Sequence, residues 1–329
     1  MEKVAAVLLS LLGILLFYAP AARAAESREH TTTPVNILFD TDMGSDCDDA
    51  GALAALHKLA DYGEVNLLGV IFSSGRNPYG VGVCDAINTY YGRGELPLGQ
   101  YKKDDVGDPV DRYCRIVATN TKAYRHNVVD SAPDLLRVYK DVLQAQPDGS
   151  VTIVTVGHLH GLSHLIDDAE GLDLVRRKVK QCVSMGGAPD TPQEEWNLCR
   201  PGVEGYVANV LKKWPTPHYI SAMGADILTG HRKLPSTPEE NPVREAYLHY
   251  DSALKKGRSS WDQVAVLYAA RPHLFKVERG TLKQDEKFRV VWSGTVSEPP
   301  RYRVIPLLPH GELEAVIEDL MSAPPRPKP

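Results

Sequence analysis

Five aspartates fall within ten residues near the start of the chain, and no other segment has side chains so suited to chemistry. They are Asp40, Asp42, Asp46, Asp48 and Asp49. Carboxylates a few ångströms apart raise each other's pKa, and a helix N-terminus can stabilise only one or two of them. A hard divalent cation takes several oxygen ligands at once and so removes this repulsion. The spacing therefore favours a cation site over a solvated acidic helix cap.

The flanking residues place the acidic segment between a strand and a helix. Val35–Phe39 is a short apolar run, typical of a strand buried on both faces, and residues 48–62 have apolar positions at helical spacing. In an open α/β sheet, ligands bind beyond the carboxyl ends of the strands. The acidic segment lies at that position.

The rest of the chain alternates in the same way. Further strands are predicted at Val65–Phe72, Val151–Val156, Val179–Met185 and His218–Met223, and further helices at Tyr79–Tyr91, Trp261–Ala270 and Glu312–Met321. This alternation predicts an α/β, Rossmann-like fold with a mostly parallel central sheet and helices on both faces.

The composition excludes several classes of protein. The chain has 329 residues, of which 43% are hydrophobic and 24% charged, with a formal net charge of −5. This is an ordinary globular composition, and without a long Lys/Arg stripe a nucleic-acid partner is not expected. The five cysteines include no C-x-x-C pair, so neither a zinc ribbon nor a thioredoxin-type site is expected.

The two ends differ in character from the body of the chain. The uncharged run 4–22, the Pro20 that interrupts it and the small-x-small exit Ala22-Arg23-Ala24 predict a cleaved signal peptide at 1–24. An uncleaved anchor is the alternative, because the run approaches the roughly 20 residues of a membrane span. We expect a secreted or periplasmic protein without stable membrane association after cleavage. It would have a mobile segment at 25–34, one domain at 35–321 with insertions near 100–130 and 230–255, and a disordered Pro-rich tail at 322–329.

Two other acidic motifs can be compared with this segment. An EF-hand loop needs Gly at its sixth position and Glu at its twelfth, but counting from Asp40 these are Ser45 and Gly51. A phosphotransferase of the haloacid dehalogenase type also has Asp-x-Asp after a strand, with the first Asp as nucleophile. Its motif continues with Thr or Val where this chain has Gly44, which weakens this alternative but leaves it open.

The acidic segment resembles the signature of the inosine–uridine-preferring nucleoside hydrolases, Asp-x-Asp-Pro-Gly-x-Asp-Asp-Ala. Here Asp40-x-Asp42-x-Gly44 leads to Asp48-Asp49-Ala50, with Met43 in place of the Pro and two extra residues near Asp46-Cys47. Later segments follow in the family's order: Asn77 after the second strand, Val154–Leu159, Met185-Gly186-Gly187, Glu195-Trp196-Asn197 and Trp261-Asp262. The resemblance implies the nucleoside hydrolase fold and calcium-dependent cleavage of the bond between ribose and a base.

The resemblance also implies a role for each matching residue. Ca²⁺ would be held by Asp42, Asp49, the Val156 carbonyl and Asp262, with Asp42 also acting as general base. The substrate, a nucleoside or other riboside, would be bound by Asp48, Asn77, Met185, Glu195, Asn197, Trp261 and Asp262. Asp48 and Asn197 would hold the 2′-hydroxyl, Glu195 the 5′-hydroxyl and Asp262 the 3′-hydroxyl. Asp40 would orient the cluster, Asp46 has no counterpart, and assembly into a homo-oligomer is plausible by resemblance alone.

The sequence leaves several alternative interpretations of these residues and of the function open. Asn77-Pro78 alone indicates a turn, Glu195–Asn197 alone a polar surface loop, and Asp262 alone a helix cap. Many family members have a His before the final Asp to protonate the leaving base, whereas this chain has Trp261. Trp261 could stack on the base, which favours purines weakly, or simply pack the pocket wall. Another N-riboside as substrate, or an exported riboside-binding protein without catalysis, remains an alternative.

Overall fold

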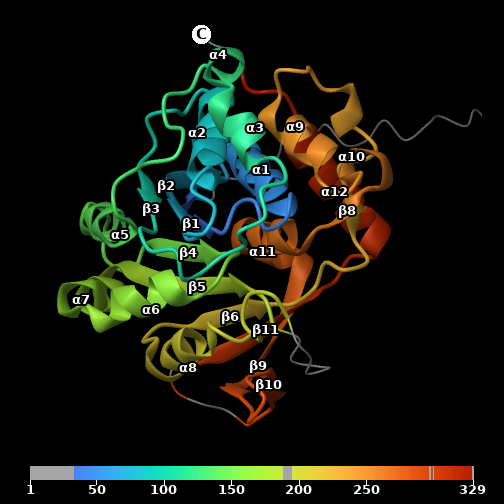
Figure 1. Ribbon diagram of the computed structural model, residues 1–329. Helices are drawn as coiled ribbons and strands as arrows, with labels where there is room; N and C mark the ends of the chain where they lie inside the picture. Colours follow the sequence, from blue (N-terminus) through green and yellow to red (C-terminus); the bar gives the residue numbers. More distant parts are fainter. Residues whose placement is uncertain (1–32, 188–194, 296–297, 299, 328–329) are drawn as a thin grey trace, which may run out of the picture. The chain divides into compact units, whose positions relative to one another are not determined.

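A computed structural model describes residues 33–187, 195–295, 298 and 300–327. The predicted signal peptide at 1–24 and most of the predicted mobile segment at 25–34 lie outside these residues. The residues from Pro34 onwards group into one unit in which strands and helices alternate, as Figure 1 shows. This arrangement confirms the predicted α/β class with helices on both faces of a mostly parallel sheet.

The main sheet has nine strands among the described residues, in the order β10-β9-β11-β6-β5-β4-β1-β2-β3. The strands predicted from apolar runs are β1 (Val35–Thr41), β2 (Val65–Phe72), β4 (Val151–Thr155), β5 (Val179–Met185) and β6 (His218–Ser221). The strands not predicted are β3 (Leu98–Gln100), β9 (Phe275–Gln284), β10 (Val290–Ser293) and β11 (Arg301–Pro306). β9 runs antiparallel to both β10 and β11, whereas the strands from β11 to β3 pair in parallel.

β1 lies inside the sheet, between β2 and β4. The chain continues from β1 outward through β2 and β3 on one side, and then crosses back to β4 on the other side. The crevice between β1 and β4 is therefore the point where the strand order reverses, which is where open α/β sheets bind ligands. The acidic segment begins at the carboxyl end of β1 and so lies at this point.

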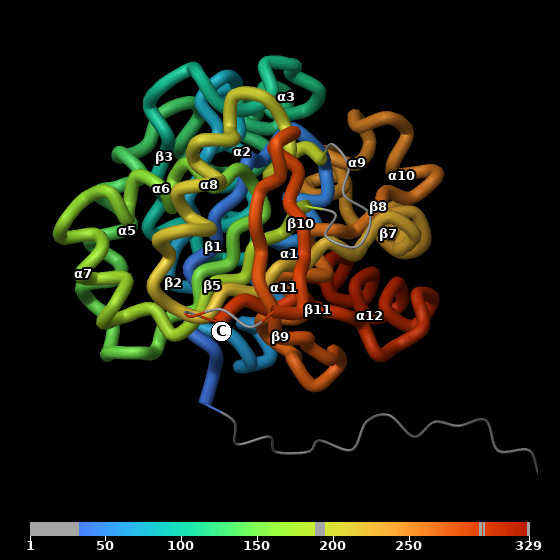
Figure 2. Tube along the Cα trace, turned by 90° about the horizontal axis from the view of Figure 1, so that it is seen from below, coloured from blue at the N-terminus to red at the C-terminus, as the bar shows by residue number. Residues whose placement is uncertain are grey.

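Alternate β1 side chains pack into two different hydrophobic cores. Ile37 and Phe39 belong to one core and Leu38 to the other, as strand alternation requires. The first core is covered by α1 (Asp48–Asp61), α2 (Gly80–Tyr90), α11 (Trp261–Ala270) and α12 (His310–Ser322). The second is covered by α5 (Leu135–Gln144), α6 (His160–Asp167), α7 (Ala169–Lys178) and α8 (Glu204–Lys213). Figures 1 and 2 show the two helical layers from two directions.

Small residues let α1 approach α11 closely. A Cβ atom added to Gly51 of α1 would lie 2.4 Å from Nε2 of Gln263 and 2.9 Å from the hydroxyl of Tyr247. The first turns of α1 and α11 consequently meet, and the backbone N–H of Asp262 donates to Oδ2 of Asp48 at 3.2 Å. Two aspartate-bearing helix starts, more than 200 residues apart in the sequence, are thus brought together.

The predicted insertions near 100–130 and 230–255 contain several short helices. These are α3 (Cys114–Thr119), α4 (Thr121–Tyr124), α9 (Pro242–His249) and α10 (Ala253–Lys256). A two-stranded antiparallel ribbon of β7 (Leu228–Thr229) and β8 (Arg258–Ser259) accompanies α9 and α10. β8 ends two residues before the first residue of α11, so its side chains lie next to the start of that helix.

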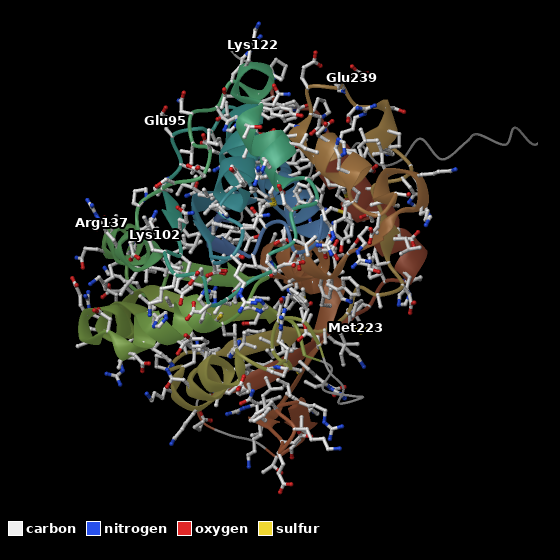
Figure 3. The ribbon with its side chains drawn as sticks, in the orientation of Figure 1. Glu95, Lys102, Lys122, Arg137, Met223 and Glu239 are labelled. Carbon is white, nitrogen blue, oxygen red and sulfur yellow. The ribbon has the colours of Figure 1, made fainter. Side chains whose placement is uncertain are left out.

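Charged side chains of both signs face outward around the unit. Figure 3 shows Glu95, Lys122 and Arg137 at the periphery, pointing away from the sheet. The predicted disordered tail at 322–329 begins inside α12, which ends at Ser322. Its next carbonyls, of Ala323 and Pro324, accept hydrogen bonds from α1 and from the end of α2. Among the described residues, no helix is both long and apolar enough to span a membrane.

Candidate active site

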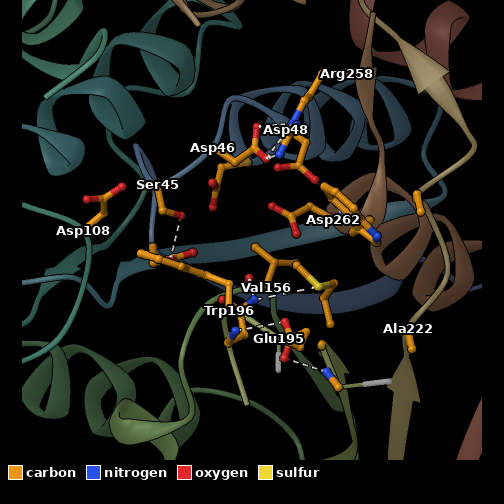
Figure 4. A pocket seen from close by; sticks show the side chains of 18 of the residues that line it. Ser45, Asp46, Asp48, Asp108, Val156, Glu195, Trp196, Ala222, Arg258 and Asp262 are labelled. Carbon is orange, nitrogen blue, oxygen red and sulfur yellow. Dashed lines mark hydrogen bonds and ion pairs between the residues drawn. The ribbon is translucent and has the colours of Figure 1, made fainter. Parts of the chain in front are cut away.

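A pocket of about 470 Å³ opens at the carboxyl ends of the central strands, where β1, β4 and β5 end side by side. Figure 4 shows its lining from close by. Its predicted site residues come from three strand ends, a loop and the starts of two helices: Asp42, Asp48, Asp49, Val156, Met185, Glu195, Asn197, Trp261 and Asp262. The parallel sheet therefore brings together nearly every residue that the sequence singled out.

Three buried carboxylates converge in this pocket. One oxygen from each of Asp48, Asp49 and Asp262 lies within 4.8 Å of the others, and each residue is about 1% exposed. Asp49 also accepts a hydrogen bond from the hydroxyl of Thr41. Oδ1 of Asp262 has no hydrogen-bond partner within the described part of the chain. A buried carboxylate oxygen without a partner carries a large desolvation cost unless a ligand binds it.

The electrostatics of this trio fit a cation. Burial raises the pKa of Asp48, Asp49 and Asp262 well above the ordinary value, and repulsion from neighbouring carboxylates is the next largest cause for each. A hard divalent cation such as Ca²⁺ prefers clustered oxygen ligands and would offset both effects. The residues present therefore fit a divalent cation, and the trio includes two of the four predicted ligands, Asp49 and Asp262.

Asp42, another predicted ligand, lies at the carboxyl end of β1 and is oriented by two donors. The hydroxyl of Ser45 donates to its Oδ2 at 2.8 Å, and the indole N–H of Trp196 donates to the same oxygen at 3.2 Å. The ring of His158 lies behind it, with Nε2 3.9 Å from Oδ2. Burial lowers the pKa of His158, although the Asp42 carboxylate opposes this. Asp42 therefore faces the pocket in a fixed orientation.

The Val156 carbonyl, the fourth predicted ligand, lies one residue beyond β4. It accepts a hydrogen bond from the side-chain amide of Asn197 at 2.6 Å. A carbonyl oxygen has two lone pairs, so this bond leaves it able to accept a second partner. Oδ1 of Asn197 is buried and has no partner among the described residues, and like the Asp262 oxygen it lines the pocket.

Glu195 holds the loop after β5 together. Its carboxylate accepts the backbone N–H groups of Gly187 at 2.8 Å, Asn197 at 2.9 Å and Leu198 at 2.8 Å. Burial raises the pKa of Glu195, and these three bonds oppose that rise. Gly186 is needed beside it because its φ is +133° and a Cβ atom there would lie 2.8 Å from Leu198. Glu195 thus fixes Asn197 at the pocket in addition to lining it.

Asp40 lies beneath the pocket and is not part of its lining. Its fully buried carboxylate accepts hydrogen bonds from Ser73 at 2.6 Å, from Thr155 at 3.2 Å and from the hydroxyl of Tyr139. Burial raises the pKa of Asp40 to about 6. A side chain enclosed in this way cannot be reached by a phosphate donor, which argues against the phosphotransferase alternative. Its position fits the predicted supporting role.

The structure does not bring Asn77, a predicted substrate-binding residue, to the pocket. Its Oδ1 accepts the backbone N–H of Tyr79 at 3.2 Å, which is the turn that Asn-Pro indicates, and its amide nitrogen points to Asp111 at 3.5 Å. The side chain of Asn77 instead accepts a hydrogen bond within the local turn that leads into α2.

Several lining residues were given no role in the site from the sequence. These are Ser45, Asp46, Asp108, Arg112, Gly186, Gly187, Trp196, Ala222, Ala225, Tyr250 and Arg258. Asp108 and Arg112 form an ion pair at 2.8 Å within one predicted insertion, and Tyr250 lies in the other. The only sequence signal for Trp196 was its place between Glu195 and Asn197.

Solved structures of similar fold include nucleoside hydrolases. A plant nucleoside hydrolase has 16% identity and a TM-score of 0.68, over 88% of this chain and 100% of that one. An inosine–uridine-preferring nucleoside hydrolase from Bacillus anthracis has 15% identity and a TM-score of 0.67, over 88% and 99%. A purine-preferring ribonucleoside hydrolase from Gardnerella vaginalis has 15% identity and a TM-score of 0.64, over 87% and 99%.

No protein-family model matches the chain, and no curated protein matches it either. At the identities of the solved structures, the similarity establishes the fold. The chain therefore has the nucleoside hydrolase fold, as the resemblance implied.

Proposed function

We propose that this protein is a calcium-dependent N-glycosidase that hydrolyses ribonucleosides to ribose and free base. The observation that carries the proposal is the buried trio of Asp48, Asp49 and Asp262 beside Asp42, at the strand ends of a nucleoside hydrolase fold. These four carboxylates also suit the oxocarbenium-like transition state of glycoside hydrolysis, because they stabilise positive charge on the sugar.

The cation would be held by Asp42, Asp49, the Val156 carbonyl and Asp262. When bound, it supplies an anchor for two ribose hydroxyls and lowers the pKa of a coordinated water. Asp42 takes the proton of the attacking water as general base. It is suited to this role because Ser45 and Trp196 fix its orientation.

The polar residues around the trio would bind the sugar. Asp48 and the amide of Asn197 hold the 2′-hydroxyl, Asp262 contacts the 3′-hydroxyl, and Glu195 lies towards the 5′-hydroxyl. Oδ1 of Asp262 and Oδ1 of Asn197 have no partner within the described part of the chain, which supports this assignment, since a sugar hydroxyl can donate to each. Met185 contributes an apolar wall beside Asn197, whose amide lies 3.8 Å from its sulfur.

Trp261 would lie against the base. It lines the pocket next to Asp262 and offers an aromatic face where many nucleoside hydrolases have a histidine. Aromatic faces stack on bases, and purines have the larger ring system. We therefore propose a preference for purine nucleosides.

The predicted signal peptide leads us to propose that the protein acts outside the cytoplasm. Its substrate would then be an extracellular or periplasmic nucleoside. Cell fractionation with an antibody against the chain, together with N-terminal sequencing of the purified protein, tests this proposal. A mature terminus near Ala25 supports export, whereas a retained N-terminus in the membrane fraction supports the uncleaved anchor.

The test of the function is release of ribose from a panel of purine and pyrimidine nucleosides by the mature protein. Each reaction is run with Ca²⁺ and with a chelator. We expect Ca²⁺-dependent release, faster for purines. The same panel should include another N-riboside, such as nicotinamide riboside.

The outcomes separate the alternatives. Release from the other riboside alone would assign the enzyme to that substrate. Tight riboside binding without release from any member of the panel would indicate a binding protein. Release that is equally fast with chelator would contradict the cation requirement.

A further inference from the structure

Arg258 lies between two aromatic rings of the pocket. Its guanidinium carbon is 5.1 Å from the ring centroid of Trp261 and 5.3 Å from that of Tyr250. All three side chains line the same pocket as the carboxylate trio. Figure 4 shows Arg258 on the side of the pocket where Asp46 and Asp48 lie, above Asp262. The part of the lining that offers flat faces for a base therefore also carries a positive charge.

Asp46 holds this arginine in place. Nε of Arg258 donates to Oδ2 of Asp46 at 2.7 Å and to Oδ1 at 3.0 Å, and Nη2 also donates to Oδ2. Such a two-pronged pair fixes the orientation of a guanidinium as well as its position. Asp46 is in the stretch of two extra residues that interrupts the family signature. The interruption therefore has a structural consequence, which is to anchor a cation beside Trp261.

The charge of this arginine is permanent. Burial is the largest single influence and opposes ionisation, but the hydrogen bonds to Asp46, the charge of Asp46 and other nearby acidic groups together raise the pKa of Arg258 above its ordinary value. Arg258 can thus donate hydrogen bonds but does not release a proton. The pair with Asp46 engages Nε and Nη2, and Nη1 takes no part in it.

The proposed reaction creates negative charge on the leaving base at this end of the pocket, and that charge must be stabilised. When the bond between C1′ and the base nitrogen breaks, the base keeps the electron pair and becomes an anion. The oxygen of water bonds to C1′, Asp42 takes one proton of that water, and the departing base gains its proton from solvent. Trp261 cannot protonate the base near neutral pH, so the negative charge needs another source of stabilisation. A fixed cation in a partly buried pocket provides it.

We propose that Arg258, positioned by Asp46, stabilises the anion of the leaving base. This inference rests on the proposed N-glycosidase function and deepens it, because it assigns a group to the step for which the chain lacks a histidine. Arg258 acts on the base, whereas the carboxylate trio acts on the sugar. Its removal should therefore matter only for substrates whose leaving group needs help.

The experiment compares two kinds of substrate in the full mature chain with Ca²⁺ present. Nucleosides have poor leaving groups, whereas the nitrophenolate of 4-nitrophenyl riboside departs without assistance. Arg258→Met keeps the aliphatic length that packs between the rings. We expect kcat for the preferred nucleoside to fall roughly 100-fold, the usual effect of losing one electrostatic stabiliser. We expect nitrophenyl riboside to be cleaved at nearly the wild-type rate.

Two further variants separate this role from a structural one. Asp46→Asn keeps the guanidinium but removes its anchor, so it should show the same substrate selectivity with a smaller loss. Added guanidinium ion should partly restore nucleoside cleavage by Arg258→Ala, since the small cation can occupy the vacated space. Arg112→Met is the matched control, because Arg112 lines the same pocket and lies over the other face-bearing ring, 5.2 Å from the centroid of Tyr250, but pairs with Asp108 instead of Asp46. Any change it causes should be equal for both substrates.

Each result has a clear meaning. Equal losses for both substrates in Arg258→Met, or no loss for either, would overturn the role of Arg258 while leaving the N-glycosidase intact. Failure of the wild type to cleave either substrate would instead overturn the proposed function itself. If Arg258→Met does not fold, the selectivity of Asp46→Asn decides the question alone, and its absence would contradict the inference.

Discussion

The carboxylate of Asp42 is oriented by one residue of its own loop and by one residue from a distant segment of the chain. Ser45 is three residues away in the same loop, whereas Trp196 comes from the loop after β5, and both donate to Oδ2. Two hydrogen bonds to one oxygen fix the plane of the carboxylate. A general base must be oriented towards the proton that it accepts, so the surroundings of Asp42 agree with the role proposed for it.

Replacing Asp42 with Asn should separate catalysis from binding. The amide keeps the size of the side chain and an oxygen that can still accept from Ser45, but it cannot take a proton from water. We expect kcat to fall by about 10²–10⁴-fold, the usual contribution of a general base, with riboside binding retained. Steady-state kinetics and calorimetric titration of the same preparation measure the two quantities.

Asp108→Asn provides the control for this substitution. Asp108 lines the same pocket and pairs with Arg112, but it lies outside the carboxylate trio. Its loss should reduce kcat far less than the loss of Asp42. An undiminished kcat in Asp42→Asn would exclude Asp42 as the base, and a complete loss of binding would show that Asp42 acts chiefly through the cation.

The residues of the site could be predicted from the sequence only where a local pattern marked them. Asp42, Val156 and Met185 end or follow apolar strand segments, and parallel strands end at a common edge, so their meeting follows from the pattern. Arg258 and Tyr250 come from a short ribbon and an insertion, and nothing in their spacing connects them to Asp46. The structure places Asn77 outside the pocket lining, because its side chain accepts a hydrogen bond within a local turn.

At the scale of elements, the position of α1 decides whether the site forms. α1 is buried along nearly its whole length, since it packs on the sheet and against α2, α11 and α12. On its α2 side, Nε2 of the fully buried His57 is 2.8 Å from Oδ1 of Asn88, and its ring stacks on Tyr91 at 5.0 Å. Burial lowers the pKa of His57 to about 3. The contact between α1 and α2 therefore requires a neutral imidazole.

This histidine should make the protein sensitive to acid. Between pH values of about 6.5 and 3, the unfolded chain binds a proton at His57 that the folded chain does not, so stability rises with pH and is lost as pH falls. His57→Gln keeps a donor for Asn88 but cannot titrate. From about pH 7 to about pH 5, the wild type should lose roughly 2 kcal/mol more unfolding free energy than this variant. Urea denaturation at both pH values measures the difference.

The partly exposed His249 on α9 offers the matched control, through the same substitution to Gln. Wild type and His249→Gln should lose stability in parallel as the pH falls. A wild type whose pH dependence equals that of His57→Gln would mean that His57 is protonated in the folded state, contrary to its burial.

The elements that the sequence failed to predict share a physical reason. β9 has the sequence FKVERGTLKQ, in which most side chains are polar or charged and several are exposed. Such a strand lacks the continuous apolar run that marks a strand buried on both faces, and so does β11, whose sequence is RYRVIP. These strands extend the sheet beyond β6. The predicted core strands, β1, β2, β4 and β5, agree with the structure within about two residues at each end, as expected for assignments of element boundaries.

The proposed cation site joins parts of the chain that are otherwise separate. Its carboxylates come from the loop after β1, the first turn of α1 and the first turn of α11, and the predicted carbonyl ligand follows β4. Without a cation, the protein must either hold protonated carboxyls or accept repulsion between buried charges. Because the pKa of each carboxyl in the trio is raised in the folded chain, the cation-free protein loses stability as pH rises through those values.

Cation binding should therefore stabilise the whole fold, and increasingly so at higher pH. A cation at about 100 times its dissociation constant adds roughly 2.7 kcal/mol. Protons compete with it for the same oxygens, so this gain shrinks as the pH falls. We expect the difference in melting temperature between Ca²⁺ and chelator to be larger near pH 8 than near pH 5.

Calorimetric melting of the wild type and Asp262→Asn, with Ca²⁺ and with chelator at each of the two pH values, measures this difference. Asp262→Asn should show a smaller difference, since it has lost a charged ligand. A difference that is independent of pH and unchanged in Asp262→Asn would mean that Ca²⁺ stabilises the protein elsewhere.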